Sequence, residues 1–356
     1  MMGAMQTIAA RSRRLLPATA AVAFAIAITL AGCSGSTPSA TSSADDLESV
    51  SGTPTASPST ETVSVPLQST TDSGAPRLEV EISVGGGAPF TVVLDTGSTG
   101  LFVSKSAVGS ATTATGQSYT EDYVSSTLTS ELATATVSIG GASTSSPMTL
   151  GLIESDDMGG IFGNAQGIMG VAPAEGAAAQ AGLLSPFVQL AAPYDQGFTV
   201  DLTGGSTGTL TLGAPSPASG TISTPLTPLP SAPAAMPDAK LWAKDVDLCW
   251  TIATLAQACG PTDLDTGAPS LLLNSAVVTG VPAGSNGVLD AGQSIAIATP
   301  AGASLWSLQT GTTAGVDLAT LDALGSETSY NTGIAFFTNH VVAFDWATGQ
   351  LLVTAT

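Results

Sequence analysis

Short apolar runs separated by Gly, Ser, Thr and Pro recur from about Thr62 to the end of the chain. The segment 78–84 alternates apolar and polar residues, which is typical of a strand with one buried face. Three glycines at 85–87 predict a turn, and the apolar segment 90–94 predicts the next strand. We therefore expect a β-rich domain that begins near Thr62.

Two further hairpins are predicted later in the chain, over residues 198–212 and 341–353, each with glycine in its turn. Helical periodicity is sparse. The segment 178–190 is the best candidate for a helix, although Gly182 and Pro186 weaken it. The pattern as a whole predicts a mostly β fold.

The first 32 residues have the pattern of an export signal. Three arginines precede an apolar stretch from Leu15 to Leu30, which is short for a membrane-spanning helix. The stretch ends in Leu-Ala-Gly followed by Cys33, which resembles the lipobox of bacterial lipoproteins, in which the cysteine is lipidated and the peptide before it removed. An ordinary signal peptide or an anchor helix is the alternative. We expect an exported protein that a lipid on Cys33 anchors at the outer face of the cell membrane.

Residues 33–61, which begin with the predicted lipidated cysteine, are rich in Ser, Thr, Pro and Ala and have almost no large apolar side chains. Such a segment cannot bury enough apolar surface to fold. We predict a flexible tether that holds a folded domain off the membrane.

The composition excludes several classes of function. The chain has 356 residues, 43% of them apolar, which suffices for a sizeable core in two lobes, two domains or one large domain. Its 7 basic and 27 acidic residues give a net charge of −20, which repels the phosphates of nucleic acids. The single histidine, His340, is expected to be structural, so a metal site built on several histidines is nearly excluded. We predict neither a metal nor a cofactor.

The chain has three cysteines and no Cys-x-x-Cys pair, so the usual zinc and redox patterns are absent from the sequence. If Cys33 carries a lipid, Cys249 and Cys259 remain, and we expect them to form a disulfide in an oxidising compartment. Two free buried thiols are the alternative. The disulfide would close a short loop and contribute about 2–4 kcal/mol to stability.

The tripeptide Asp-Thr-Gly occurs at residues 95–97 and again at 265–267, each time ahead of an apolar run. One copy in a chain rich in Thr and Gly is weak evidence, because the same tripeptide forms ordinary turns. Two copies, separated by about half a large domain, indicate an internal duplication.

A duplication of this kind can bring two carboxylates together. Carboxylates that lie a few ångströms apart cannot both ionise readily, so they share one proton. One then acts as general base on a bound water, and the other acts as general acid towards a substrate carbonyl. Asp95 and Asp265 are therefore the candidate catalytic pair.

From about Val63 to its C-terminus the chain resembles the pepsin-like aspartic proteases. The segment 90–103 is similar to the first catalytic loop of that family, and 167–171 and 331–337 are similar to the elements that lie beneath its two loops. The segment 341–353 resembles the closing strands of the family. The relatives that this resemblance suggests include secreted mycobacterial members.

The resemblance implies a bilobal pepsin-like fold with an internal pseudo-twofold duplication, with a first lobe over 62–212 and a second over 213–356. It also implies an aspartic endopeptidase in which Asp95 and Asp265 activate a water that hydrolyses the peptide bond. The expected partner is a polypeptide substrate, with apolar residues on both sides of the cut bond. We expect a monomer.

The resemblance also assigns residues that support the pair. Thr96 and Thr266 would exchange hydrogen bonds between the two loops, and Ser98 would hydrogen-bond the first aspartate. Gly97 and Gly267 would let the backbone turn tightly and approach the acids.

The flap tyrosine of the family lies on a hairpin before a strand that ends in Gly-Gly. Counting back from Gly140 and Gly141 places Tyr123 at this position, and Tyr119 is the second candidate. For either tyrosine the alternative is ordinary packing within a strand.

The chain departs from the family around the second aspartate. Ala268 stands where a hydroxyl side chain is expected, although retroviral aspartic proteases also carry alanine there. Ser270 could supply the hydroxyl if the loop holds one extra residue. The segment 260–263 lacks the apolar run of a strand. Asp263 is interpreted as a bystander whose charge could raise the pKa of the pair.

Two other interpretations stay open. The chain could be an inactive pepsin-like lipoprotein that binds a peptide or protein at the cell surface. It could also be a structural envelope protein with chance motifs, which would require five coincidences in the correct order. Retention of both aspartates argues against the inactive protein, because two carboxylates that repel each other have no chemical reason to persist there.

Overall fold

The computed structural model describes residues 61–71, 75–123, 126–153, 162–311, 318–324 and 328–356. All of them lie within one compact unit, residues 56–356. The predicted export signal, Cys33 and the tether up to residue 60 lie outside the described residues. In the described part of the chain, no helix is long and apolar enough to cross a membrane.

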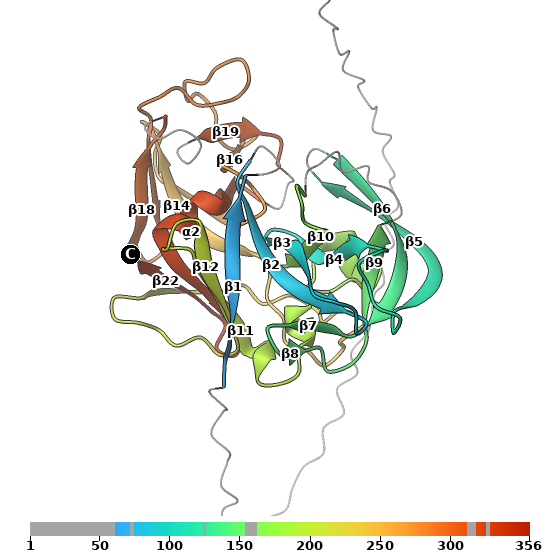
Figure 1. Cartoon of the computed structure of the whole chain (residues 1–356). Helices are drawn as coiled ribbons and strands as arrows, with labels where there is room; N and C mark the ends of the chain where they lie inside the picture. The colour runs from blue at the N-terminus through green and yellow to red at the C-terminus, as the bar shows by residue number, and fades with distance from the viewer. Residues whose placement is uncertain (1–60, 72–74, 124–125, 154–161, 312–317, 325–327) are drawn as a thin grey trace, which may run out of the picture. The chain divides into compact units, whose positions relative to one another are not determined.

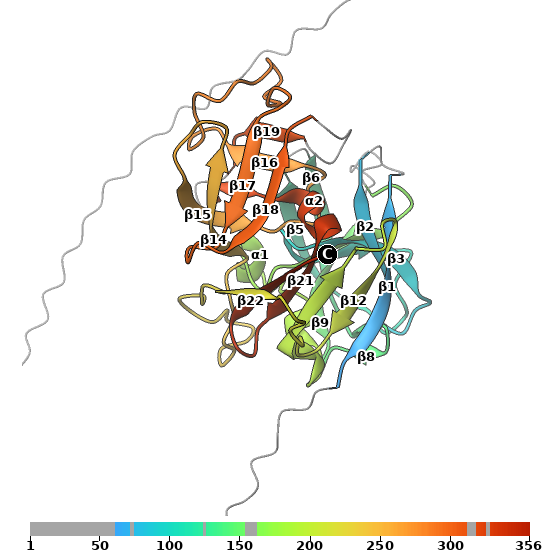
Figure 2. The same ribbon diagram turned by 90° about the vertical axis from the view of Figure 1, so that its left-hand side faces the viewer.

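Two sheets hold nearly all of the regular structure, and Figures 1 and 2 show the strands of the smaller sheet grouped together. Within the described ranges, the larger sheet has 15 strands. They are β1 (Val63–Thr70), β2 (Arg77–Val84), β3 (Phe90–Asp95), β4 (Thr99–Ser104), β5 (Thr113–Tyr123), β6 (Ser126–Ala135), β7 (Val137–Ile139), β8 (Ala142–Ser143), β9 (Met148–Ile153), β10 (Gly167–Val171), β11 (Gly197–Asp201), β12 (Thr207–Leu212), β13 (Ile222–Pro225), β21 (His340–Asp345) and β22 (Gln350–Ala355).

The smaller sheet has 7 strands among the described residues, all from the second half of the chain. They are β14 (Asp245–Ile252), β15 (Ala258–Asp263), β16 (Leu271–Asn274), β17 (Ser294–Ala298), β18 (Ser304–Gln309), β19 (Ala319–Asp322) and β20 (Tyr330–Asn331). The mostly β class predicted from the sequence is thus confirmed.

The larger sheet extends across the lobe boundary predicted at residue 213. Its strands β13, β21 and β22 come from the predicted second lobe, and β21 pairs antiparallel with β11, with Phe198 opposite Phe344. Figure 1 shows β22 running near β11 and β12. The closing hairpin predicted over 341–353 is present, and it joins the end of the chain to the sheet of the first half.

Alternating residues explain how β2 contributes to the core. Leu78, Val80, Ile82 and Val84 are all buried, whereas Glu81 between them is exposed. Each such apolar side chain contributes about 1.5–3 kcal/mol when it is removed from water. Most buried apolar residues of the two sheets form one cluster that extends from the first strand to the last, and a smaller separate cluster includes Phe102 and Leu128.

The helix predicted over 178–190 is wrong in extent. The structure has a short helix α1 (Gly176–Gln180) and a 3₁₀ turn at Phe187–Gln189 instead. Gly182 has a φ of +81°, which interrupts the helical path. The other helical elements are α2 (Gly333–Asn339) and a 3₁₀ turn at Tyr194–Gln196.

Residues 258–263 form β15, although the sequence there has Pro261 and no apolar run. The strand pairs antiparallel with β14 and, at Thr262 and Asp263, parallel with β20. Hydrogen bonding to two neighbours therefore maintains this strand where local propensity does not.

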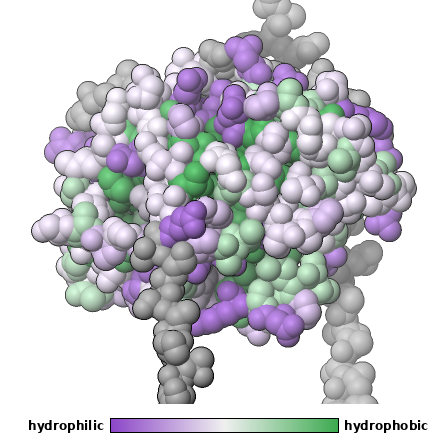
Figure 3. Space-filling view, turned by 60° about the horizontal axis from the view of Figure 1, so that its bottom comes forward, coloured by the Kyte–Doolittle hydropathy of each residue, from purple (hydrophilic) through white to green (hydrophobic). Residues whose placement is uncertain are grey.

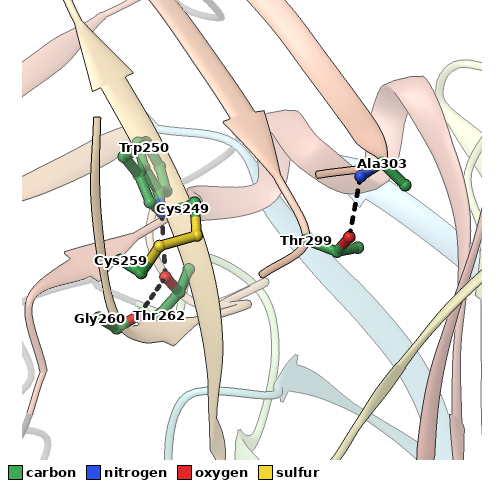
Figure 4. Close-up of a disulfide and its surroundings, with 7 residues drawn as sticks. All are labelled: Cys249, Trp250, Cys259, Gly260, Thr262, Thr299 and Ala303. Atoms are coloured by element: carbon green, nitrogen blue, oxygen red, sulfur yellow. Dashed lines mark hydrogen bonds between the residues drawn. A yellow bond between two sulfur atoms is a disulfide. The ribbon is translucent and has the colours of Figure 1, made fainter. Parts of the chain in front are cut away.

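Cys249 and Cys259 lie opposite each other across β14 and β15 and form the predicted disulfide (Figure 4). Beside it, the Trp250 indole nitrogen donates to the Thr262 hydroxyl at 3.0 Å. The disulfide and this hydrogen bond tie together the two strands that lead to the second Asp-Thr-Gly.

The described residues expose few large apolar side chains. Among them, Val277 and Leu318 are the exposed large apolar residues. The face shown in Figure 3 is mostly pale, with scattered hydrophilic residues and small apolar areas. The large apolar side chains of the described residues are thus nearly all placed in the core.

Candidate active site

The two Asp-Thr-Gly loops lie at the wall of one cavity of about 600 Å³. We call residues 95–98 the first loop and residues 265–268 the second loop. Asp95 ends β3 and is buried, and Asp265 follows β15 and is half-buried. Both aspartates line the cavity, so the structure brings together the two acids that the repeat singled out.

Each aspartate lies against the backbone of the opposite loop. A Cβ at Gly97 would lie 2.4 Å from Cγ of Asp265, and a Cβ at Gly267 would lie 2.6 Å from Cγ of Asp95. Only glycine leaves room for this approach. Each glycine also donates its backbone N–H to the aspartate of its own loop, at 2.8 Å for Asp95 and 2.6 Å for Asp265.

Thr96 and Thr266 join the loops by reciprocal hydrogen bonds. The N–H of Thr96 donates to the Thr266 hydroxyl at 3.1 Å, and the N–H of Thr266 donates to the Thr96 hydroxyl at 2.9 Å. The Thr96 hydroxyl donates to the Leu264 carbonyl beneath the second loop, and the Thr266 hydroxyl donates to the Leu94 carbonyl beneath the first loop. All of these groups are buried, so water does not compete with them.

The strands beneath the loops are also arranged alike. β10 lies parallel to β3 with Gly170 opposite Asp95, and β20 lies parallel to β15. The N–H of Ala172 donates to the Ser98 carbonyl, and the N–H of Ile334 donates to the Ala268 carbonyl, both at 2.9 Å. The segments 167–171 and 331–337 thus lie beneath the two loops, as the resemblance to the pepsin-like proteases implied.

The outer oxygens of the two aspartates have different partners. The Ser98 hydroxyl donates to Oδ2 of Asp95 at 2.7 Å. The side-chain amide of Asn331 on β20 donates to Oδ2 of Asp265 at 2.8 Å. Among the described residues, Ser270 makes no hydrogen bond to Asp265, so the suggestion that it replaces the missing hydroxyl is wrong, because Asn331 reaches that oxygen.

The environment of Asp95 favours its protonated form. Burial and the neighbouring carboxylate of Asp265 raise the pKa of Asp95 from an ordinary 3.8 to about 7. Hydrogen bonds from Ser98 and Gly97 oppose this rise. Because the two acids interact, the titration belongs to the pair, and the pair retains one proton at mildly acid pH.

Tyr123 lies at the end of β5, where β5 and β6 form a hairpin, and it lines the cavity. Its hydroxyl oxygen is buried and makes no hydrogen bond within the described residues. Burial and the nearby Asp95 raise the pKa of Tyr123 above its ordinary 10, so the hydroxyl stays protonated and able to donate. Tyr119, the second candidate, stacks on Phe102 with ring centroids 6.1 Å apart.

A charged cluster that the sequence did not predict lines the cavity beside the second loop. Nζ of Lys244 lies 2.6 Å from Oδ2 of Asp263 and 3.0 Å from Oδ1 of Asp245. Burial alone would lower the pKa of Lys244, but the two carboxylates outweigh it and raise the pKa. Thr328 donates to the other oxygen of Asp245 at 2.8 Å. Asp263 is therefore an ion-paired, buried acid and not a solvated bystander.

Arg77 is a second cation near the pair that the sequence did not predict. It lines the cavity from β2, and its Nη1 donates to the Gly267 carbonyl at 3.2 Å. Burial lowers the pKa of Arg77, while Asp95 and Asp265 oppose that effect. A guanidinium remains charged under these conditions, so Arg77 adds positive charge beside two acids.

The sequence offered only faint signals for these residues. Asn331 occupies the place in the second half that the apolar Ile168 occupies in the first. A polar residue at that place was the one signal in the sequence that Asn331 has a role. Arg77 and Lys244 are two of the chain's 7 basic residues, and their scarcity in an acidic protein was the only indication of a role.

Comparisons with known proteins confirm the predicted pepsin-like fold. The family model of the PE-PGRS C-terminal aspartyl peptidase-like domain matches residues 63–351. Among solved structures, the aspartic proteinase from Irpex lacteus is similar with a TM-score of 0.56 and 16% sequence identity, over 82% of this chain and 97% of that chain. A search of curated proteins found no match.

Proposed function

Because the chain belongs to the family of PE-PGRS C-terminal aspartyl peptidase-like domains, we propose that it is an aspartic endopeptidase that uses Asp95 and Asp265. One observation carries the proposal. Two buried or half-buried carboxylates, each lying against the glycine of the opposite loop, line a single cavity and are held there by reciprocal threonine hydrogen bonds.

The chemistry follows from the shared proton. A water between the carboxylates gives a proton to the ionised one as its oxygen attacks the peptide carbonyl carbon. The protonated carboxyl gives its proton to the carbonyl oxygen, so a neutral tetrahedral diol forms. When the C–N bond breaks, the diol returns one proton to the pair and the amine leaves with another. No covalent bond to the protein is needed.

The surroundings fit a peptide substrate. Val93, Ile168 and Phe162 provide apolar lining on the side of the first loop. Tyr123 presents a protonated hydroxyl with no partner among the described residues, which suits a hydrogen bond to the bound peptide. The hairpin that carries Tyr123 would then act as the flap over the substrate.

The proposal extends to location on sequence grounds alone. Arginines, an apolar stretch and Leu-Ala-Gly before Cys33 support export and a lipid anchor at the outer face of the cell membrane. The tether that follows would place the peptidase at a distance from that membrane.

The experiment is cleavage of a mixed peptide library by the full-length chain from pH 3 to 8, beside Asp95→Asn and Asp265→Asn. We expect cleavage at acid pH that falls as pH rises through about 7, where the pair loses its shared proton. Each substitution should lower kcat at least about 10³-fold, because neither acid can act alone.

Binding of pepstatin, a mimic of the tetrahedral state, distinguishes an active peptidase from an inactive binding protein when no cleavage is seen. A wild-type protein that binds pepstatin without cutting any peptide would support the inactive binding protein instead. Cleavage by either Asn variant at the wild-type rate would refute the assignment of the pair.

A further inference from the structure

The partner of the second aspartate comes from a different strand than expected. Asn331 lies on β20 and is 6% exposed, and its Nδ2 donates to Oδ2 of Asp265 at 2.8 Å. The second loop itself has Ala268 three residues after its aspartate, where the first loop has Ser98. The second loop therefore lacks a hydroxyl at that position, and a distant amide supplies the donor.

The amide of Asn331 is held in one orientation. The backbone N–H of Gly333 donates to its Oδ1 at 2.8 Å, so the oxygen faces the start of α2 and the nitrogen faces the aspartate. Reversal of the amide would place its oxygen against a carboxylate oxygen and its nitrogen against an N–H. Only the observed orientation satisfies both neighbours.

The corresponding residue beneath the first loop cannot perform this task. In the parallel pairing of β10 with β3, Ile168 lies opposite Val93, two residues before Asp95. In the pairing of β20 with β15, Asn331 lies opposite Asp263, two residues before Asp265. The same place in the two halves thus holds an apolar side chain beneath the first loop and a hydrogen-bond donor beneath the second.

We infer that Asn331 is the positioning residue of Asp265, replacing the loop hydroxyl that Ser98 supplies to Asp95. The inference rests on the proposed peptidase function. A fixed donor on the outer oxygen orients the carboxylate, leaves its inner oxygen for water, and favours the ionised form of the pair. Asn331 thereby acts through Asp265.

The decisive variants transfer the arrangement of the first half to the second. Asn331→Ile copies Ile168, and Ala268→Ser copies Ser98. We expect Asn331→Ile alone to lower kcat about 10- to 100-fold with KM changed less than about 3-fold, because a misplaced carboxylate impairs the chemistry and not binding. The double variant Asn331→Ile/Ala268→Ser should recover most of the lost kcat.

The pH dependence provides a readout that a merely structural role would not change. Loss of the donor should move the titration of the pair to higher pH, and Ala268→Ser in the double variant should move it back. Asn339→Ala, at an exposed asparagine of α2, is the matched control and should leave the rate and the pH profile unchanged.

A measurement on the wild-type protein keeps the test independent of activity and of variant folding. The side-chain amide signals of Asn331 in nuclear magnetic resonance should shift as the pair titrates. Signals that do not follow this titration, or a folded Asn331→Ile with wild-type kcat and pH profile, would overturn the inference. A wild type without cleavage refutes the proposed function, and the amide titration then decides the role of Asn331 by itself.

Discussion

The two Asp-Thr-Gly loops share a backbone design and differ in the side chains beneath them. Both aspartates accept a hydrogen bond from the glycine of their own loop and lie against the glycine of the other loop. The two threonines make equivalent hydrogen bonds across the loops. Beneath the first loop three supporting positions are apolar. Beneath the second loop the corresponding positions carry an ion pair and an amide.

Strand register defines the correspondence. In the first half, Glu79 lies opposite Val93. In the second half, Asp245 lies opposite Asp263. The residues that precede Glu79 and Asp245, which are Leu78 and Lys244, therefore occupy equivalent positions. The apolar set is Leu78, Val93 and Ile168, and the polar set is Lys244, Asp263 and Asn331. The two halves are thus alike in the loops that carry the two acids. They differ in the residues beneath the loops, where either apolar packing or hydrogen bonding can support a loop.

The largest effect on stability is expected from breaking the ion pair. Lys244→Leu leaves Asp263 buried without its cation, and we expect the free energy of unfolding to fall by about 3–5 kcal/mol. Lys244→Leu/Asp263→Val copies the first half and should recover most of this loss, because a packed apolar pair needs no charge compensation.

Urea unfolding at pH 7 measures both variants. Equal stability of the single and double variants would show that the loss does not come from an unpaired charge on Asp263. Lys240→Leu, at an exposed lysine over the ring of Trp242 that does not line the cavity, is the matched control.

A somewhat smaller effect is expected from the pair itself, and it depends on pH. The folded-state pKa of Asp95, about 7, lies above its ordinary 3.8, so the folded protein binds the proton more tightly than the unfolded chain. Stability from this group is fully present below pH 4 and is lost as pH rises through 7. Asp95→Asn removes this loss, so at pH 7.5 it should be more stable than wild type by up to about 4 kcal/mol.

Thermal unfolding of both proteins from pH 3.5 to 7.5 tests this expectation. The stability difference should widen with rising pH and be smallest near pH 4. A difference independent of pH would mean that neither burial nor Asp265 raises the pKa of Asp95 in the folded protein.

The smallest expected effect concerns the symmetric threonines. Thr96→Val and Thr266→Val each leave a buried N–H and a buried carbonyl without a partner, at a cost of about 2–3 kcal/mol. The two losses should agree within about 0.5 kcal/mol, and the double variant should cost less than their sum because the hydroxyls share one network. Chemical denaturation measures this, and a clearly unequal pair of losses would contradict the symmetry of the loops.

Local sequence determined much of the molecule. Alternation and glycine turns predicted β2, the hairpins of β11 with β12 and β21 with β22, and the mostly β class, because side-chain direction and turn conformation depend on neighbouring residues. The repeated Asp-Thr-Gly singled out both acids for the same reason: a tight turn after a strand is a local property. Cys249 and Cys259 were also identified as a disulfide before the strands that carry them were known.

Tertiary structure decided the rest. β15 forms despite Pro261 because β14 and β20 flank it. The contact of Asn331 with Asp265 spans 66 residues, and that of Lys244 with Asp263 depends on the register of β14 on β15. No periodicity encodes such contacts, because they exist only once separate strands align, and a residue's polarity alone does not reveal which distant carboxylate it will meet.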